Sequence, residues 1–460
     1  MAASKVKRNL TDGPLLPKMI LFTLPLIATA FLQQLFNTAD TVVVGQWGGS
    51  TPAERETALA AVGSCGALIN LIVNLFFGLS VGAGVCVAHD IGAKQYRDVK
   101  RTVHTSVIVS LFFGALLTVF GLCMARPLLA MMKTDPTVLD EAVPYMMAYF
   151  CGMPANILYN YCASILRSSG DTTRPLIFLS AAGVANVGLN LVMVIVFGLG
   201  ALGVGIATAA SHWVACVLIL IYMMRIDGPC KIELRELRVY PEKLKKIIVI
   251  GLPAGLQGTL FSFSNVLIQS SINGFGDVAF VAGNTAASNI DSYIYASQNA
   301  LYHTALTFVG QNLGAKKLDR VKRSILLSAC VVTVVGLSVG CLALLFGRPL
   351  LSIFTDSTAV IDAGMIRLSI MGVTYFLCGL MEVGCGVMRG FGKSLPPMIV
   401  SLVGSCLFRI VWIYTIFAAF PTPFMLYLSY PISWLLTAGT HFLFCGLTYR
   451  KIKQHIANES

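Results

Sequence analysis

Three acidic residues lie deep inside long apolar segments of this sequence: Asp40, Asp291 and Glu382. A charged side chain at the middle of a lipid bilayer costs about 2.5–3.5 kcal/mol on insertion scales, so such a residue is a candidate for function by default. A carboxyl group placed there can take up and release a proton or a small cation. For Asp40 the alternative interpretation is a structural carboxylate held by hydrogen bonds between helices.

Amide and hydroxyl side chains accompany Asp40 in the same half of the chain. Asn186 and Asn190 are four residues apart, which places them on one face of a helix. Asn160 and Thr208 lie in the apolar segments before and after that helix. One carboxylate, three amide oxygens and a hydroxyl would make a hard, oxygen-rich set of ligands, suited to a proton or Na⁺ and not to a transition metal.

The apolar segment 278–311 is unusually polar for a membrane helix. Polar residues recur along it at spacings of three, four and eight residues, which is one helical face: Asn284, Ser288, Asp291 and Asn299. This stripe predicts the wall of a wetted cavity in which Asp291 attracts cationic substrates, with hydrogen bonds between packed helices as the alternative. Further candidates for a substrate cavity are Gln33 and Gln257.

Glu382 and Arg409 are deep charges on successive apolar segments. We expect opposite charges in this position to pair, because an unpaired charge in the membrane is costly. The pair is interpreted either as a structural ion pair or as a second site for a proton or for a substrate's charge.

The elements that carry these residues follow from the composition. The chain has 460 residues, of which 56% are hydrophobic and only 12% charged, and its mean hydropathy is +0.77. This balance excludes soluble, disordered and disulfide-rich classes and predicts an all-α membrane protein. We count twelve apolar segments, at 18–45, 57–88, 102–125, 142–166, 175–197, 201–224, 247–273, 278–311, 324–346, 362–388, 396–418 and 424–449.

The basic residues predict how these segments cross the membrane. With the N-terminus in the cytoplasm, 27 of the 33 lysines and arginines fall in cytoplasmic segments. This asymmetry follows the positive-inside rule, so both termini are expected in the cytoplasm of a multi-pass protein of the cell membrane. The net charge of +12 is then a signal of topology, and no nucleic-acid partner is expected.

The sequence also repeats itself at an offset of 222 residues. The segment Ile91-Gly92-Ala93-Lys94 matches Leu313-Gly314-Ala315-Lys316, and Arg126-Pro127-Leu128-Leu129 matches Arg348-Pro349-Leu350-Leu351. The repeat predicts two pseudo-symmetric six-helix lobes. The expected domains are a cytoplasmic N-terminal segment (1–17), an N-lobe (18–224), a cytoplasmic linker (225–246), a C-lobe (247–449) and a cytoplasmic tail (450–460). Pro25 and Pro253 interrupt the first span of each lobe and are candidate hinges, with a static kink as the alternative.

Several motifs together resemble the multidrug and toxic compound extrusion (MATE) family, in particular a branch from Gram-positive anaerobes. They are Leu24-Pro25-Leu26, Asn37-Thr38-Ala39-Asp40-Thr41, Gly92-Ala93, Leu166-Arg167-Ser168-Ser169-Gly170-Asp171, and Gly203-x-Gly205-Ile206-Ala207-Thr208. The resemblance implies that Asp40, Asn160, Asn186, Asn190 and Thr208 form a cation site in the N-lobe. Many relatives carry Asp at the position of Asn190, and its absence weakens the case for a tight Na⁺ site at Asp40.

Taken together, the sequence predicts a secondary active exporter. It would exchange organic cations or amphipathic drugs for H⁺ or Na⁺ by alternating access, with Asp40 as the coupling carboxylate. We expect a monomer in contact with membrane lipids, no cofactor other than the coupling ion, and no enzymatic activity, since no nucleotide-binding or hydrolase motif stands in a suitable context. The alternative is a flippase for a lipid-linked or polyisoprenoid-linked precursor.

Overall fold

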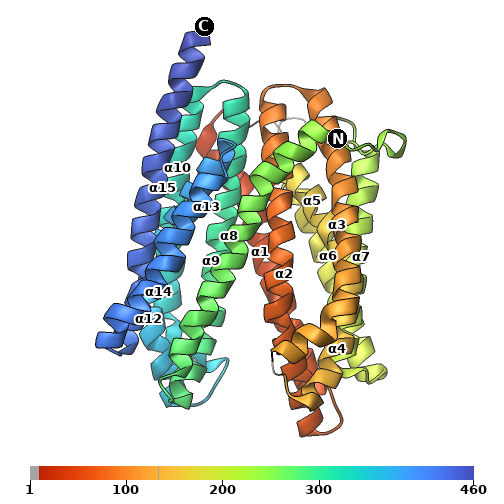
Figure 1. The fold of residues 1–460 in the computed structure, drawn as a ribbon, viewed down its shortest axis with the longest axis vertical. Helices are drawn as coiled ribbons and strands as arrows, with labels where there is room; N and C mark the ends of the chain where they lie inside the picture. The colour runs from red at the N-terminus through yellow and green to blue at the C-terminus, as the bar shows by residue number, and fades with distance from the viewer. Residues whose placement is uncertain (1–9, 133, 460) are drawn as a thin grey trace. The chain divides into compact units, whose positions relative to one another are not determined.

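The first half of the chain folds into helices connected by short turns. A computed structural model describes residues 10–132 and 134–459, and Figure 1 shows the order of the elements. The helices of this half are α1 (Leu15–Trp47), α2 (Pro52–Gly92), α3 (Tyr96–Met131), α4 (Pro136–Cys151), α5 (Met153–Ser168), α6 (Thr173–Asn190), the π-helical turn η2 (Leu191–Val196) and α7 (Gly200–Arg225).

The second half is also helical and follows a short 3₁₀ turn, η3 (Leu234–Glu236). Its helices are α8 (Pro241–Asn273), α9 (Val278–Gly314), α10 (Leu318–Leu345), α11 (Gly347–Ser352), α12 (Thr358–Gly390), α13 (Leu395–Ser401), η4 (Leu402–Leu407), α14 (Phe408–Trp412), η5 (Ile413–Phe417) and α15 (Pro423–Glu459). Both η4 and η5 are π-helical.

The helices confirm the all-α membrane fold, and each of the twelve predicted segments lies on helical structure. Within the described residues, nine helices are long and apolar enough to cross a membrane. Three of the predicted segments are not a single α-helix, and one of them, 175–197, passes from α6 into the π-helical turn η2. The segment 142–166 is divided between α4 and α5 at Gly152, because Pro154 cannot continue the hydrogen bonds of the preceding helix. The segment 396–418 alternates between α-helical and π-helical turns.

The backbone repeats with the same offset as the sequence. Lys94 and Lys316 both have left-handed backbones, with φ of 58° and 55°, although neither is a glycine. Gly170 and Gly392, which are also 222 residues apart, have φ of 95° and 78° after α5 and α12. A left-handed residue lets the chain leave a helix sharply, and glycine adopts it without a steric cost. The repeat therefore extends to individual turns.

The chain divides into two compact units, and two helices contribute to both. The first unit contains residues 31–91 and 95–255, and the second contains residues 10–30, 92–94 and 256–459. The division cuts α1 after Ala30 and α8 after Gly255, a few residues beyond Pro25 and Pro253 respectively. The predicted lobes, 18–224 and 247–449, each contain their first helix whole, so their bounds differ from those of the two units. The lobes remain a prediction.

In the first unit, the beginning of α8 packs closely against α2. A Cβ atom on Gly78 would lie 2.0 Å from the backbone nitrogen of Gly255, and one on Gly82 would lie 2.3 Å from the carbonyl oxygen of Ile247. This approach is possible only because the residues at the contact are glycines. Two residues before the end of α2, Asp90 accepts a hydrogen bond from Lys243 of α8, at 2.8 Å, in a buried ion pair.

In the second unit, the beginning of α1 packs against α9 and α10. Thr23 and Thr304 share a hydrogen bond of 2.8 Å, and the rings of Phe22 and Phe308 meet edge to face. Arg320 of α10 donates hydrogen bonds to the carbonyl oxygens of residues 10, 12 and 13, which precede α1. Each unit therefore holds the start of a helix that ends in the other unit.

The linker between the halves is tied to α3. Lys100 contacts Glu236 at 2.7 Å and Glu233 at 3.0 Å. These hydrogen bonds raise the pKa of Lys100, and the hydrogen bond from Lys100 lowers the pKa of Glu233. A depressed carboxyl pKa contributes stability at neutral pH that is lost as the pH falls through the lowered value, so this attachment weakens in acid.

Replacing Lys243 by Met leaves the carboxylate of Asp90 buried without its cation. We expect a loss of about 3–5 kcal/mol in stability, the cost of an uncompensated buried charge. The measurement is the melting temperature of the purified protein in detergent. The matched control is Lys245→Met, since Lys245 is exposed on the same helix.

The double variant Lys243→Met with Asp90→Asn should recover most of that loss, because no charge is then left unpaired. Equal melting temperatures for Lys243→Met and Lys245→Met would show that the buried ion pair does not hold α8 in the first unit.

Candidate functional site

The strongest candidate site surrounds Asp40 in the second half of α1, within the first unit. Asn190 of α6 donates a hydrogen bond from Nδ2 to Oδ1 of Asp40. Thr208 of α7 donates from Oγ1 to Oδ2 of Asp40 at 3.5 Å. Asn190 also donates to Oδ1 of Asn186, at 3.3 Å. Four of the five residues predicted for the cation site are thus brought together by three helices.

Asn160, the fifth predicted residue, belongs to a separate hydrogen-bond chain. Its Nδ2 donates to Oδ1 of Asn156 at 2.7 Å, and Nδ2 of Asn156 lies 3.2 Å from Nε2 of His212. No hydrogen bond joins Asn160 to Asp40 in the part of the chain that the structure describes. The sequence analysis missed Asn156 and His212, although each lies four residues from a predicted site residue, Asn156 before Asn160 and His212 after Thr208.

Two tyrosines of α4 also belong to the surroundings of Asp40. Tyr145 and Tyr149 lie within electrostatic range of its carboxyl group, and Tyr149 packs edge to face on the ring of His212. Tyr149 therefore lies between the carboxyl group of Asp40 and the hydrogen-bonded residues Asn160, Asn156 and His212. No motif of the sequence singles out these tyrosines, because aromatic residues are common in apolar segments.

The contact between α1 and α6 depends on a glycine. A Cβ atom on Gly183 would lie 1.8 Å from the ring of Phe36, so the ring occupies the space that any other side chain would need. Phe36 precedes Asp40 by one helical turn, and Gly183 precedes Asn186 by almost one turn. The packing of Phe36 on Gly183 therefore sets the distance at which Asn190 meets Asp40.

The amide of Asn190 has one group that the protein leaves unused. Its Oδ1 atom is buried and has no hydrogen-bond partner among the described residues. Asp40 itself receives only a neutral amide and a neutral hydroxyl, and no Lys, Arg or His of the described chain forms an ion pair with it. The carboxyl group is therefore free to change its charge, and a neighbouring carbonyl oxygen is available to a small cation.

In the second unit, Asp291 is neutralised by an arginine. Nε of Arg367 contacts Oδ2 of Asp291 at 2.7 Å, and Nη1 of Arg367 contacts Oδ1 of Asn284 at 2.7 Å. The hydroxyl of Tyr427 also donates to Oδ1 of Asn284, at 3.0 Å. From the sequence, Asp291 was expected either to offer an open charge to cationic substrates or to take part in hydrogen bonds between packed helices. The structure corrects the first expectation, because the charge of Asp291 lies in a closed ion pair.

The expected pair of Glu382 and Arg409 is not formed among residues 10–132 and 134–459. Arg409 donates from Nε to the hydroxyl of Ser433 at 3.0 Å and stacks on the ring of Tyr430. Glu382, on α12, has no hydrogen bond or ion pair to a described residue, and lies within electrostatic range of Arg389. The pairing is wrong because α12 presents Glu382 towards Arg389, whereas Arg409 turns towards α15.

The other predicted residues have different surroundings. Gln257 accepts a hydrogen bond from Arg389 at 2.8 Å and donates to Ser401 at 3.2 Å, in a buried network. Gln33 is exposed on α1. Pro25 and Pro253 lie inside α1 and α8.

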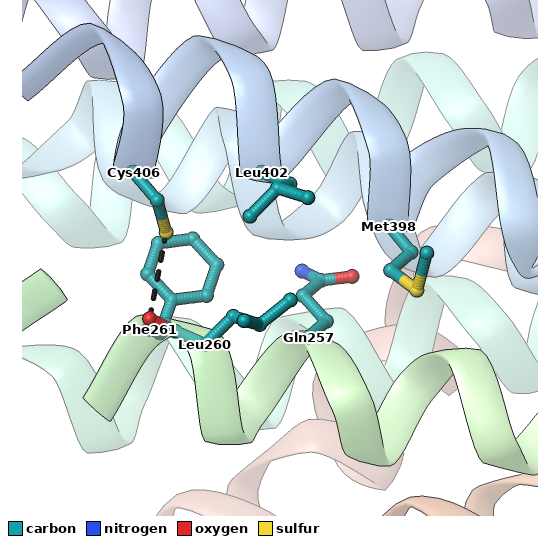
Figure 2. A pocket seen from close by; sticks show the side chains of 6 residues that line it. All are labelled: Gln257, Leu260, Phe261, Met398, Leu402 and Cys406. Carbon is teal, nitrogen blue, oxygen red and sulfur yellow. Dashed lines mark hydrogen bonds between the residues drawn. The ribbon is translucent and has the colours of Figure 1, made fainter. Parts of the chain in front are cut away.

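Gln257 also borders a small pocket between α8 and the α13–η4 segment. Figure 2 shows the six side chains that line it, around an open hollow of about 130 Å³ that includes solvent-facing space. Across the pocket, Sγ of Cys406 approaches the carbonyl oxygen of Leu260 at 3.7 Å (Figure 2). The surface that the pocket exposes is apolar, because both ends of the Gln257 amide are bound by Arg389 and Ser401.

Comparison with known proteins identifies the family. The sequence model described as MatE matches residues 25–192 and 253–415, which are the two halves of the repeat. The chain belongs to the MatE family. The resemblance seen in the sequence motifs is thereby confirmed, and the chain is a multi-pass membrane transport protein, not an enzyme.

Individual relatives match over most of their length. The "probable multidrug resistance protein YoeA" of Bacillus subtilis is 26% identical over 84% of this chain and 83% of its own. The "FAD transporter" of Shewanella oneidensis is 24% identical over 86% and 87% of the two chains. A solved structure described as the outward-facing conformation of a multidrug resistance MATE family transporter has a TM-score of 0.89, 22% identity, and coverage of 97% of this chain and 99% of that one.

The role of Gly183 can be tested by adding one methyl group. We expect Gly183→Ala to push Phe36 away, separate α1 from α6 and lower stability by about 1–3 kcal/mol, as is usual for overpacking. Gly188→Ala is the matched control on the same helix, because a Cβ atom there meets nothing within 4 Å. The measurement is the melting temperature in detergent.

The second variant, Phe36→Leu combined with Gly183→Ala, should restore part of the loss by vacating the space of the ring. If Gly183→Ala and Gly188→Ala behave alike, the packing of Phe36 does not position Asp40.

Proposed function

We propose that this protein is a secondary active multidrug exporter that moves organic cations or other amphipathic drugs out of the cell in exchange for an inward-moving cation. Asp40 is the coupling carboxylate. The family and the names of relatives such as the multidrug resistance protein of Bacillus subtilis support export of drugs. Because another relative is named as an FAD transporter, the substrate class rests on this proposal and not on the comparisons.

The observation that carries the proposal is the set of partners of Asp40. A carboxylate fixed by a guanidinium or ammonium group gains little from binding another cation. Asp40 instead receives hydrogen bonds from the amide of Asn190 and the hydroxyl of Thr208. Both groups are neutral, so the negative charge of Asp40 can be cancelled by an ion that arrives and restored when the ion leaves.

The coupling mechanism follows from that change of charge. A cation that reaches Asp40 from outside removes the negative charge that attracts the hydrogen of Asn190 Nδ2, and the contact between α1 and α6 weakens. The first unit then repacks, with α1 bending near Pro25, and substrate is released outside. When the cation leaves to the cytoplasm, the restored charge re-forms the contact and returns the protein to the state that accepts substrate.

A proton is the favoured coupling ion. The atoms that face the carboxyl oxygens of Asp40 are donors, an amide Nδ2 and a hydroxyl, whereas Na⁺ requires several oxygen ligands. For Na⁺ to bind, the amide of Asn190 would have to rotate so that its unpartnered Oδ1 turns towards Asp40. A proton needs no such rearrangement. Glu382, which lacks a hydrogen-bond partner in the described chain, is a second proton-binding group in this proposal.

The remaining features of the proposal come from the sequence. Both termini lie in the cytoplasm, the protein works as a monomer surrounded by lipid, and it needs no cofactor besides the coupling ion. A flippase for lipid-linked precursors is not favoured. Among the described residues the deep arginine Arg367 is neutralised by Asp291, and the single buried arginine without an acid, Arg409, is too little charge for a polyanion.

The proposal predicts that Asp40→Asn folds and reaches the membrane but exports ethidium at least about tenfold more slowly, since the substitution fixes this intramembrane group in a neutral state. The measurement is dye efflux from proteoliposomes, with a proton gradient and a Na⁺ gradient imposed separately. Asp227→Asn, which changes an exposed carboxylate of the linker, is the control. Efflux by Asp40→Asn at the rate of the control would refute the role of Asp40.

A further inference from the structure

The buried charges of the second unit do not balance. Asp291 is taken by Arg367, at 2.7 Å. Glu382 lies in the range of Arg389. Arg409 then remains without an acid, and no carboxylate of the described chain lies within ion-pair distance of its guanidinium group. The interior of this unit therefore contains one uncompensated positive charge.

Arg409 is deeply buried, with only 3% of its surface exposed. Its Nε donates to the hydroxyl of Ser433, which in turn donates to the carbonyl oxygen of Tyr430 at 2.8 Å. The guanidinium carbon lies 4.1 Å from the centre of the Tyr430 ring and 5.8 Å from that of Trp434. One nitrogen of the guanidinium group lacks a hydrogen-bond acceptor: Nη2 is buried and has no partner in the described chain.

The aromatic rings cannot complete this site. A ring face attracts a cation from above, but it supplies no acceptor in the plane of the guanidinium, where the N–H bonds of Nη2 point. A charged donor without an acceptor is among the most unfavourable buried groups, and a neutral hydroxyl such as Ser433 does not cancel the charge. Both deficits are removed by one anion bound at Nη2.

The backbone around Arg409 also departs from a regular helix. Arg409 lies in α14, a single short α-helical stretch between the π-helical turns η4 and η5. Wide turns of this kind change the direction of side chains and occur often at functional sites. The corresponding helix of the first half likewise turns into a π-helix, η2, directly after Asn190. The repeat places Val187 at the position of Arg409, so the positive charge is particular to the second half.

We propose that Arg409 is the charged centre of an anion site in the second half of the chain, which binds one monovalent anion, either a free halide or the carboxylate of a transported compound. A single free guanidinium nitrogen suits a single negative charge better than a phosphate with two. The carboxylate form of the proposal rests on the proposed export function, whereas the halide form does not. With Asp40, the chain then has one site for each sign of charge.

The first experiment measures binding without transport. The melting temperature of the purified protein is followed in detergent while gluconate is replaced by chloride or by acetate at constant ionic strength. We expect a saturable rise for the wild type, as for a ligand that binds only the folded state, and no rise for Arg409→Gln. Arg126→Gln, which removes an exposed arginine, should keep the response of the wild type.

The second experiment measures specificity with two dyes that differ only in one carboxyl group, a rhodamine with a free acid and its ethyl ester. Arg409→Gln should lower export of the free acid about tenfold relative to the ester, the loss expected for one charged hydrogen bond. Arg409→Lys keeps the charge, so its ratio of free-acid to ester export should lie between the ratios of the wild type and of Arg409→Gln. If the bound anion is a halide alone, the dyes are affected equally and only the melting temperature responds.

Two results together would overturn the proposal. They are a wild-type melting temperature that does not depend on the anion, and a ratio of free-acid to ester export that is the same in the wild type and in Arg409→Lys. If Arg409→Gln does not fold, the dependence of the wild-type melting temperature on the anion still decides between the outcomes. Failure of the export proposal is distinguishable, since the wild type would then show no gradient-driven dye efflux while its anion response in detergent is unaffected.

Discussion

A carboxyl group inside a membrane must have a partner, and the kind of partner decides what the group can do. Asp291 is held by the guanidinium of Arg367, and its charge is fixed by that ion pair. Asp40 is held by an amide and a hydroxyl, and its charge is not cancelled by the protein. In the proposed function, the same residue type serves as a structural element in one half and as an ion-responsive element in the other.

The two halves of the chain have similar backbone conformations but different buried polar side chains. Left-handed turns at Lys94 and Lys316 and π-helical turns in corresponding helices show that the repeat persists in detail. The side chains have diverged, because the first half carries the carboxyl group of Asp40 and the second carries the unpaired guanidinium of Arg409. A duplicated fold can in this way provide two unlike sites within related helical frames.

The sequence predicted the fold because the signals for it are strong and local. Long apolar segments, the distribution of lysine and arginine, and the doubled motifs each constrain the helices. It also predicted that Asn186, Asn190 and Thr208 gather with Asp40, once the family resemblance was available. The breaks inside three predicted segments were missed, since Pro154 and the π-helical turns change the path of a segment without changing its hydropathy.

The partners of buried charges were harder to predict. Glu382 and Arg409 were expected to pair because they are opposite charges on successive segments, yet the rotation of each helix points them elsewhere. Arg367 was the true partner of Asp291, at a separation of 76 residues, and no spacing rule finds it. Asn156 and His212 were missed as well, because polar residues one turn from a site residue are visible only when the helices are assembled.

The most direct test of the central claim is to count the protons that substrate displaces. Purified protein in weakly buffered detergent is mixed with a permanently charged organic cation, and the pH change is recorded. We expect the wild type to release up to about half a proton per protein at the midpoint of its titration, where the carboxyl group is half protonated, and Asp40→Asn to release almost none. Equal proton release by the wild type and by Asp40→Asn would contradict the claim that the charge of Asp40 couples the ion to the substrate.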